Sequence, residues 1–415
     1  MFFASLMRQL VTRGELTLID ANGGVHKVGD PASGPRVTVR LRDAALHLSL
    51  FFNPRLRLGE AYMDGRLTVE NGRAYDLLDL IARNLGEGTV GWLDRWKMQA
   101  AMLWRNVRQA NRLPQSRRNV AHHYDLSGEL YDLFLDADRQ YSCAYFLDPE
   151  MDLDTAQLAK KRHIAAKLLL RPGDSVLDIG CGWGGLAAYL AGAGAGPVTG
   201  ITLSQEQLDH ARQMAKTQGL DSKLKFDLRD YRQQTGRFDR IVSVGMFEHV
   251  GVPNYGTFFR KVADLLADDG VALIHTIAHR DPPFPTNAWI QKYIFPGGYT
   301  PSLSEVLPAI EAAGLWVTDI EVLRLHYAET LRHWRQRFLD NWDRAARLYD
   351  ERFCRMWEFY LAGCEAAFRH QGQMVAQIQI AKSVETVPLV RDYIAAWEQA
   401  HPLPGRPEKT RLRLA

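Results

Sequence analysis

The chain has 415 residues, of which 46% are hydrophobic and 24% charged, and its formal net charge is +3. This balance is typical of a folded protein with a sizeable core, excludes an intrinsically disordered chain, and leaves any anionic partner to be met by a local basic patch. Its four cysteines (Cys143, Cys181, Cys354 and Cys364) show no CxxC pair and no metal-ligand spacing. We therefore expect reduced thiols, no metal site and a cytoplasmic location.

Residues 13–70 are expected to form short strands. GELTLID and RVTVRLRDAALHLSL alternate apolar and polar residues, and the intervening ANGGVHKVGDPASGP is rich in turn residues. Residues 75–112 then change to a helical period, with Trp92, Trp96, Leu103 and Val107 on one stripe that ends at Pro114. We therefore predict a smaller α+β N-terminal domain over residues 1–115.

From Asp174 onward, strands and helices alternate. Strands are expected at SVLDIG, PVTGITLS, LKFDLRD, FDRIVSVG and GVALIHTI, which predicts a doubly wound α/β domain with a mostly parallel sheet. Residues 281–302 are too long and too rich in Pro and Gly for a simple connection, so we expect a lid-like insertion that caps a site. A late strand, WVTDIEVL, precedes a long helix with an apolar stripe of Tyr327, Leu331, Trp334, Phe338 and Trp342.

A glycine-rich loop follows the first strand of this α/β pattern. Gly180-x-Gly182-x-x-Gly185 lets the backbone approach a ligand closely, with a helix N-terminus behind it. Alone, it could bind NAD, FAD or S-adenosylmethionine, or form a tight turn without a ligand. Asp178 completes the D-x-G-x-G pattern of methyltransferases, and no acidic residue ends the second strand to hold a dinucleotide ribose. The loop therefore favours S-adenosylmethionine.

Polar residues after the second and third strands are further candidates for holding this cofactor. Thr202 and Gln207 follow the second strand, and Asp230 and Tyr231 follow the third, where they are placed to read the adenine. From the sequence alone these residues could equally be helix caps, Ser204 especially.

Glu248 and His275 lie near the ends of the fourth and fifth predicted strands. Because ligands bind outside the carboxyl ends of such strands, both side chains should converge beside the cofactor loop, although a buried histidine is often only a core residue. Methyl transfer from a sulfonium needs chiefly orientation and electrostatics. Surplus aromatic residues indicate either an apolar or cationic reacting group or ordinary core packing: Tyr131, Phe134, Tyr141, Tyr145, Phe146, Trp289, Tyr293 and Phe295.

Seven motifs together resemble one family. HHYDLSGELYDLFLD, YSCAYF, VLDIGCGWGG, MFEHVG, IHTIA, KYIFPGG and HYAETLRHW are similar to cyclopropane-fatty-acyl-phospholipid synthases and to mycolic acid cyclopropane synthases, from about residue 120 to 395. The N-terminal FFNPRLRLGEAYMDG resembles the leading domain of the phospholipid-acting members. The resemblance implies a class I, Rossmann-like methyltransferase domain over residues 116–402, followed by a basic tail at 403–415.

The resemblance also implies a reaction and a set of site residues. This family transfers the methyl carbon of S-adenosylmethionine to a cis double bond of a phospholipid acyl chain, and a bound bicarbonate ion removes the proton that closes the ring. Its bicarbonate ligands correspond here to Cys143, Glu248, His275, Ile277 (through its backbone) and Tyr327. Its cofactor contacts correspond to Tyr141, Ser142, Gly180, Gly182, Thr202, Gln207, Asp230 and Tyr231. Cys143 is thus expected to be part of an anion site and not a nucleophile, since nothing marks it as a lowered-pKa thiolate.

The expected partners are a phospholipid with unsaturated acyl chains, an anionic membrane surface and a second copy of the chain, but no nucleic acid. We expect a cytoplasmic enzyme at the inner face of the membrane. Residues 92–118 hold seven basic residues against one acidic residue, together with three tryptophans. That composition fits either an amphipathic helix on an anionic surface or a helix packed on the catalytic domain.

Three other functions stay open. A fatty-acyl C-methyltransferase that makes branched chains and a small-molecule amine methyltransferase share this architecture. A catalytically silent lipid-binding protein is the third, against which the intact glycine-rich loop argues.

Overall fold

The structure is a computed structural model that describes residues 2–85 and 127–404. Its N-terminal part is an α+β fold, as expected, with a sheet in the order β2-β1-β3-β4 in which only β1 and β3 are parallel. The strands are β1 (Gly14–Ile19), β2 (Val25–Asp30), β3 (Arg36–Leu41) and β4 (Leu67–Val69). The helices are α1 (Phe2–Leu10), α2 (Leu46–Phe52), α3 (Pro54–Met63) and α4 (Ala74–Asn84).

Two segments of this part differ from the predicted strands and turns. Residues 25–30, expected within a turn, form the edge strand β2, which has little apolar signal because only Val28 is buried. Residues 46–50, expected to be a strand, belong to helix α2. Leu46, His47 and Leu50 are buried on one helical face and Leu48 is exposed, whereas a strand would have put all three leucines on one side.

A second sheet of seven strands carries the rest of the chain, in the order β10-β11-β9-β8-β5-β6-β7. The five strands from β9 to β7 are parallel, and β10 and β11 extend the sheet in antiparallel fashion. The parallel strands are β5 (Val176–Ile179), β6 (Val198–Thr202), β7 (Leu224–Leu228), β8 (Phe238–Val244) and β9 (Leu266–His279). The predicted doubly wound, mostly parallel sheet is therefore present, and its strand order reverses at β5, between β6 and β8.

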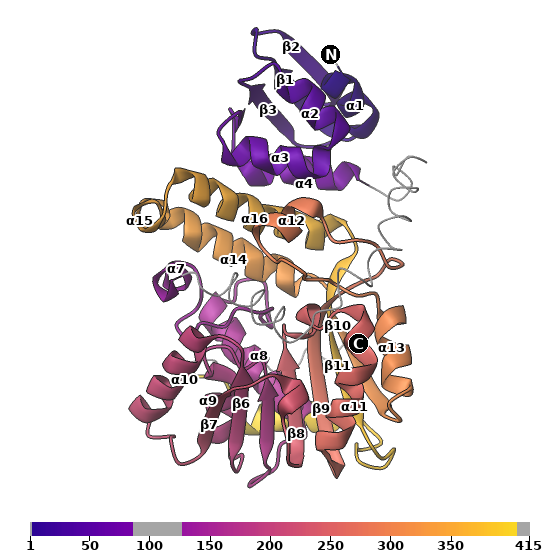
Figure 1. Ribbon diagram of the computed structural model, residues 1–415. Helices are drawn as coiled ribbons and strands as arrows, with labels where there is room; N and C mark the ends of the chain where they lie inside the picture. Colours follow the sequence, from indigo (N-terminus) through magenta and orange to yellow (C-terminus); the bar gives the residue numbers. More distant parts are fainter. Residues whose placement is uncertain (1, 86–126, 405–415) are drawn as a thin grey trace, which may run out of the picture.

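Helices connect these strands and cover the sheet (Figure 1). They are α7 (Gly128–Asp132), α8 (Leu153–Lys167), α9 (Gly185–Gly192), α10 (Gln205–Thr217), α11 (Tyr255–Leu265), α13 (Leu303–Glu311) and α17 (Asp392–Ala400). Short 3-10 turns, η1 (Tyr231–Gln233), η2 (Phe247–His249) and η3 (Val252–Asn254), follow β7 and β8. No helix among the described residues is long and apolar enough to cross a bilayer.

Strand β11 (Gln373–Ala381) lies between β9 and β10 (Trp316–Leu323) and was not predicted. Its residues 375–381 are all buried, but Gln377 and Gln379 interrupt the apolar run that would have marked a central strand. The predicted long helix is also two helices, α14 (His326–Asp340) and α15 (Trp342–Leu348), so Trp342 begins a new element and does not extend the stripe.

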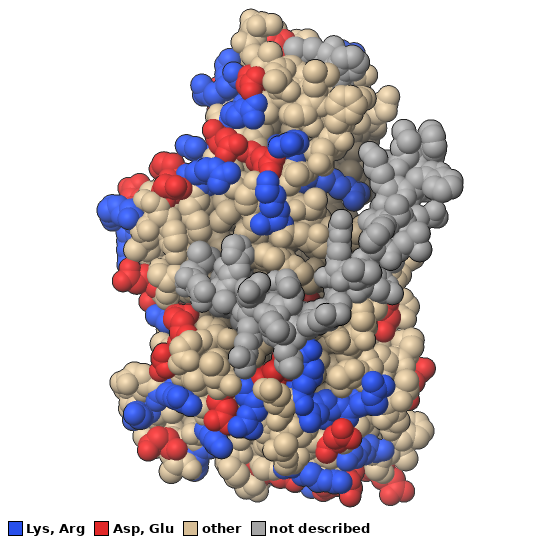
Figure 2. Space-filling view, viewed as in Figure 1, with Lys and Arg blue, Asp and Glu red and all other residues tan. Residues whose placement is uncertain are grey.

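A helical layer separates the N-terminal domain from the large sheet (Figure 1). It consists of α14, α16 (Glu351–His370) and α12 (Ala288–Tyr293), and α12 is the helix of the predicted 281–302 insertion. Helices α3 and α4 pack against this layer, and charged side chains of both signs gather along the junction (Figure 2). The expected boundary at residue 115 lies outside the described residues, as do residues 92–118.

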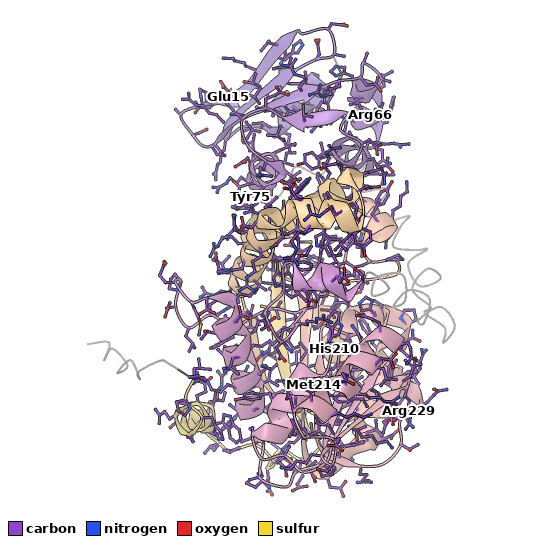
Figure 3. All side chains as sticks on the ribbon, turned by 90° about the vertical axis from the view of Figure 1, so that its left-hand side faces the viewer. Glu15, Arg66, Tyr75, His210, Met214 and Arg229 are labelled. Atoms are coloured by element: carbon purple, nitrogen blue, oxygen red, sulfur yellow. The ribbon has the colours of Figure 1, made fainter. Side chains whose placement is uncertain are left out.

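Several side-chain contacts fix that junction. Glu60 accepts hydrogen bonds from Lys292 Nζ at 2.7 Å and from the Tyr293 hydroxyl at 2.9 Å. The Arg335 guanidinium lies 4.4 Å from the ring centre of Tyr75, which Figure 3 shows beside the helical layer and far from His210 on α10. The N-terminal domain is thus attached directly to the 281–302 insertion.

Candidate active site

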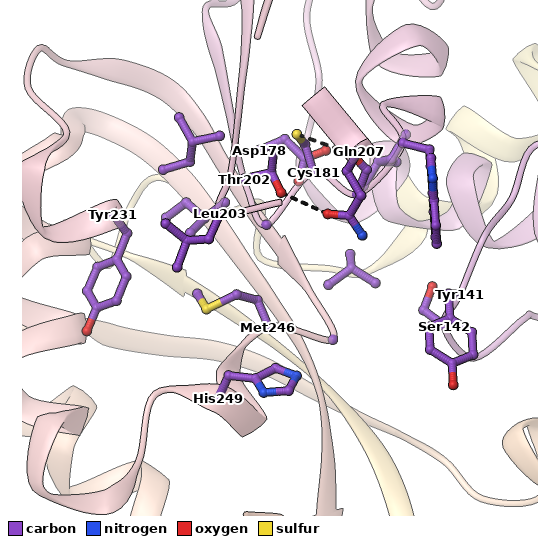
Figure 4. Close-up of a pocket in the computed structure, with 18 of the residues that line it drawn as sticks. Tyr141, Ser142, Asp178, Cys181, Thr202, Leu203, Gln207, Tyr231, Met246 and His249 are labelled. Carbon is purple, nitrogen blue, oxygen red and sulfur yellow. Dashed lines mark hydrogen bonds between the residues drawn. The ribbon is translucent and has the colours of Figure 1, made fainter. Parts of the chain in front are cut away.

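A pocket opens at the carboxyl ends of β5, β6, β7 and β8, where the strand order reverses (Figure 4). The glycine-rich loop forms one wall. Gly180 and Gly182 have φ of +82° and +55°, a backbone conformation that other residues rarely adopt, and a Cβ at Gly182 would meet nothing within 4 Å. The loop backbone is therefore open toward the pocket at Gly182, as close approach of a ligand requires.

The nine residues predicted to hold the cofactor all line this one pocket. Figure 4 shows Tyr231 at one end and Tyr141 and Ser142 at the other, with Thr202 and Gln207 between them. The Thr202 hydroxyl donates to Gln207 Oε1 at 2.8 Å, which orients both side chains. The pocket is thus long and polar at intervals, a shape that suits an extended nucleoside-amino acid ligand.

The cap interpretation also holds for two residues here. Ser204 caps α10, since its hydroxyl accepts the Gln207 N–H at 3.3 Å. Asp230 caps η1 through the Arg232 N–H at 2.9 Å, and its second oxygen binds the Arg232 guanidinium at 2.7 Å. Asp230 therefore lines the pocket and has a structural role as well.

Asp178 is fully buried in the floor of the pocket. Burial raises the pKa of its carboxyl to about 7, and the nearby charge of Lys160 opposes that rise. Oδ2 of Asp178 has no hydrogen-bond partner among the described residues. An orphaned buried oxygen is costly, so it marks a place where a bound ligand or water would donate a hydrogen bond.

Helix α8 holds the YSCAYF segment against the pocket, which the sequence did not indicate. Gln157 donates to the carbonyls of Gln140 and Ser142 at 3.1 and 3.0 Å. Lys160, with no exposed side-chain surface, donates to Gln140 Oε1 at 2.8 Å and to the Ser142 hydroxyl at 2.7 Å. Polar residues in a helix look like a solvated face in sequence, so no signal could have placed Lys160 here.

The opposite side of this segment meets α16. The hydroxyls of Tyr141 and Tyr360 are 2.8 Å apart. Burial raises the pKa of Tyr360 well above its usual value, and Tyr141 and Tyr327 raise it further. Tyr360, which the sequence reasoning missed, therefore contacts a pocket residue and belongs to the same buried cluster as the predicted anion ligand Tyr327.

Glu248 contacts strand β9 at Ile277, two residues beyond His275, the residue with which the strand ends predicted it to converge. Glu248 Oε1 accepts the Ile277 N–H at 2.6 Å, and Oε2 is buried with no hydrogen-bond partner among the described residues. Burial raises the pKa of this carboxyl to about 7. The Ile277 N–H is thus engaged with Glu248, where the resemblance implied a direct contact with an ion.

His275 lies within β9, two residues before Ile277, and faces the same side of the sheet. Burial lowers its pKa to about 3, so the ring is neutral. The side-chain amide of Gln377 on β11 lies against His275, with 3.2 Å between the amide nitrogen and Nδ1 of the ring, and so holds the ring in place. Gln377 is a further residue that the sequence reasoning missed, because β11 was not predicted.

Cys143 and Tyr327 belong to one buried cluster, against which Ile277 packs. Burial raises the pKa of Cys143 far above its usual value, and its thiol donates to the Ala144 carbonyl at 3.3 Å. The Ala144 N–H binds the hydroxyl of Thr330, one helical turn beyond Tyr327 on α14, at 3.0 Å. A protonated, inward-facing thiol fits a wall residue and not a nucleophile.

None of the five predicted anion ligands lines the open pocket itself, whereas Gly245, Met246 and His249 on either side of Glu248 do. The Gly245 N–H donates to the His275 carbonyl at 2.9 Å, which joins β8 to β9 behind this wall. Pro296 and Gly297 of the 281–302 insertion also line the pocket.

Comparison with known proteins agrees with this geometry. Residues 111–378 match the family model described as mycolic acid cyclopropane synthetase. The chain is 39% identical over 348 residues to a probable fatty acid methyltransferase of Pseudomonas putida, covering 82% of this chain and 85% of that one. It is 43% identical over 263 residues to the cyclopropane-fatty-acyl-phospholipid synthase of Escherichia coli K12, covering 63% and 67%.

Solved structures agree as well. A mycolic acid cyclopropane synthase complexed with S-adenosylhomocysteine superposes with a TM-score of 0.61 at 36% identity, over 64% of this chain and 97% of the other. The doubly wound domain is therefore a class I S-adenosylmethionine-dependent methyltransferase fold, as the sequence predicted.

Proposed function

The chain belongs to the mycolic acid cyclopropane synthetase family, and we propose that it is a cyclopropane-fatty-acyl-phospholipid synthase. Family membership makes it an S-adenosylmethionine-dependent lipid methyltransferase. The proposal adds the substrate, a cis double bond in a phospholipid acyl chain, and the product, a cyclopropane ring.

In this proposal, S-adenosylmethionine lies along the pocket with its adenine at the Tyr231 end and its amino acid group at the Tyr141 end. Asp230 and Tyr231 hold the adenine, Thr202 and Gln207 the ribose, and Tyr141 and Ser142 the amino acid end. The arrangement is supported by their order along the pocket and by the open backbone at Gly182. The co-substrate supplies an electrophilic methyl carbon, and the residues around it supply orientation and exclude water.

Ring closure needs a base beside the new methyl group. Attack of the alkene on the sulfonium methyl leaves a carbocation, and loss of a proton from the added carbon lets the ring close. A bound bicarbonate would supply this base. Glu248 Oε2 would accept its O–H and the Nε2–H of His275 would donate to it, while Tyr327 is a further donor.

The observation that carries this part is the buried Glu248 Oε2, which has no hydrogen-bond partner among the described residues, together with the neutral, buried ring of His275, to which we assign a proton on Nε2. A buried anion is tolerated only with hydrogen bonds around it. We assign the Ile277 N–H to orienting Glu248, because that bond is already made. Cys143 completes the apolar side of the site.

The proposal also covers the oligomeric state of the enzyme and its place in the cell. The enzyme acts as a homodimer on unsaturated phospholipids at the cytoplasmic, anionic face of a membrane. The basic, tryptophan-rich segment at residues 92–118, which lies outside the described residues, supports membrane contact.

The nearest rival is a fatty-acyl C-methyltransferase, which the name of the Pseudomonas putida relative favours. Both reactions begin with the same cation, but only the cyclopropane synthase closes a ring as the added carbon loses a proton. A branching enzyme that first shifts a hydride along the chain would lose its proton to leave a methylene branch. The buried, unpartnered Glu248 Oε2 supports a base held at the site.

The test is product analysis. Purified enzyme is incubated with dioleoylphosphatidylglycerol vesicles and S-adenosylmethionine labelled with carbon-13 in the methyl group. The proposal expects a gain of one CH2 per acyl chain and labelled ring protons upfield of ordinary methylene in the NMR spectrum. A labelled methyl branch would establish the rival, and unchanged lipid at saturating co-substrate would contradict both.

A further inference from the structure

One helix of the N-terminal domain carries large apolar side chains on both of its sides. Helix α2 buries Leu46 and Leu50 in the core, yet Leu48, Phe51 and Phe52 are 51%, 39% and 72% exposed. Positions 48, 51 and 52 have i, i+3, i+4 spacing and so form one face. A helix that borders only water normally turns polar residues outward. A cluster of exposed apolar residues of this kind is typical of an interaction surface.

Few charged residues lie near this face. Asp43 pairs with Arg66 and Glu60 pairs with Lys292, and the charged residues between them in sequence are Arg55 and Arg57. Arg57 is paired with Glu60, whereas Arg55 is exposed and forms no ion pair with any described residue. Helix α1 packs against α2 and adds the exposed Arg8 in its last turn. Exposed phenylalanines beside arginines suit the interface of an anionic bilayer, where rings insert and guanidinium groups meet phosphates.

A second exposed apolar stretch lies in the catalytic domain and has a different charge. Leu389 and Val390 are 102% and 60% exposed between β11 and α17. Its charges are balanced, since Lys382 and Arg391 lie in the same stretch as Glu385 and Asp392. Both basic side chains are already paired, Lys382 with Asp268 and Arg391 with Asp319, so they offer an anionic surface less than an unpaired arginine does. Of these two surfaces, charge complementarity therefore favours α2.

We propose that Leu48, Phe51, Phe52 and Arg55 form an anchor that inserts into the anionic surface of a phospholipid bilayer. Figure 2 shows a mostly uncharged surface over α1 and α2, at the end of the molecule away from the large sheet. The anchor rests on the proposed function, since a lipid substrate is what brings the enzyme to a membrane. Because it lies on another domain than the pocket, it raises the local concentration of enzyme at the bilayer and takes no part in methyl transfer.

Vesicle sedimentation of the full chain, without S-adenosylmethionine, tests the anchor. The variants are Phe51→Ser/Phe52→Ser and Arg55→Glu, with Leu389→Ser as the control for an equally exposed apolar residue. On phosphatidylglycerol vesicles, we expect the double variant to lose roughly tenfold or more in affinity. Arg55→Glu loses less, and its deficit disappears in high salt. Leu389→Ser binds like the wild type, and all variants turn over phospholipid dispersed in detergent micelles.

Two results would overturn the anchor. The first is wild-type vesicle binding by the double variant; if that variant also elutes at a changed size, a second copy of the chain covers α2. The second is an equal loss in Leu389→Ser, which would show general apolar adsorption. Failure of the proposed function is distinguishable: wild type would bind vesicles through α2 yet leave their lipids unmethylated.

Discussion

Two buried carboxyl groups, Asp178 and Glu248, lie at the ends of neighbouring strands, and one oxygen of each accepts no hydrogen bond from the described residues. Burial raises the pKa of both to about 7, so a ligand on either oxygen decides whether the group carries a proton at neutral pH. Buried carboxyl groups with a raised pKa and an oxygen free of hydrogen bonds are typical of sites that bind a ligand or transfer a proton.

Glu248→Gln tests the role of its carboxylate. The amide keeps an acceptor for the Ile277 N–H but can never ionise, so we expect product formation to fall by about a hundredfold or more, with S-adenosylmethionine affinity unchanged. Isothermal titration measures the affinity and lipid mass spectrometry the product. Wild-type turnover in this variant would contradict the assignment.

The same variant makes a prediction about pH. The folded-state pKa of Glu248 is raised, so the folded protein favours the neutral carboxyl and loses stability as pH rises from the unfolded value of 4.5 through about 7. Glu248→Gln does not titrate. Its melting temperature relative to the wild type should therefore be lower or equal at about pH 4 and should rise toward about pH 8. A constant difference across that range would show that Glu248 is not perturbed.

Lys160 is the second residue whose role we expect to measure. Lys160→Met removes both hydrogen bonds that position Gln140 and Ser142, so the dissociation constant for S-adenosylmethionine should rise by about tenfold. Lys161→Met is the matched control, since Lys161 is the next residue of α8 and binds Asp138, which does not line the pocket. Equal effects of the two substitutions on the dissociation constant would remove Lys160 from the site.

Individual residues were predictable where a motif fixes them. The glycines of the loop and the strand-end Glu248 follow from the order of strands. No motif predicts Lys160, Tyr360 or Gln377. Each reaches the site from a distant element and looks like an ordinary helix or strand residue in the sequence. Tertiary packing, and not local pattern, brings them to the site.

At the scale of elements, the alternation of strand and helix patterns along the chain predicted the parallel strands correctly, and the prediction of elements failed where burial was uneven. LHLSL satisfies both a strand and a helix pattern, and the buried set Leu46, His47 and Leu50 decides for the helix. In β11, the buried Gln377 and Gln379 break the apolar run that a central strand normally shows. Polar residues inside the sheet are retained because they bind His275 and the Lys167 carbonyl.

The contact between α3 and α12 allows an element-scale prediction. A Cβ at Gly59 would lie 2.6 and 2.7 Å from Cδ1 and Cε2 of Trp289, so Gly59→Ala forces the two helices apart. We expect a loss of about 1–3 kcal/mol in urea unfolding. Gly363→Ala is the control: its Cβ would meet Leu78 at an ordinary 3.8 Å, and the better helix former should add up to about 1 kcal/mol. Similar effects of the two would mean that the α3–α12 packing is loose.

At the scale of the whole molecule, contacts connect the N-terminal domain, which carries the proposed anchor, to the helical layer and through it to the pocket. The N-terminal domain holds α12 through Glu60, and the insertion that contains α12 supplies Pro296 and Gly297 to the pocket. The position of the pocket was predictable because doubly wound sheets bind ligands where strand order reverses. The docking of the N-terminal domain was not, because its contacts join residues more than 200 positions apart.

The most direct test of the central claim follows the hydrogens of the transferred methyl group. Enzyme is given unsaturated phosphatidylglycerol and S-adenosylmethionine carrying three deuterium atoms on the methyl carbon, and the acyl chains are weighed by mass spectrometry. Ring closure removes one hydrogen from the added carbon, so the account predicts a cyclopropane product that keeps two of the three deuterium atoms, both on the ring carbon. A product that keeps all three, or one that carries two of them on a vinylic methylene, would contradict it, because the enzyme would then be a branching methyltransferase.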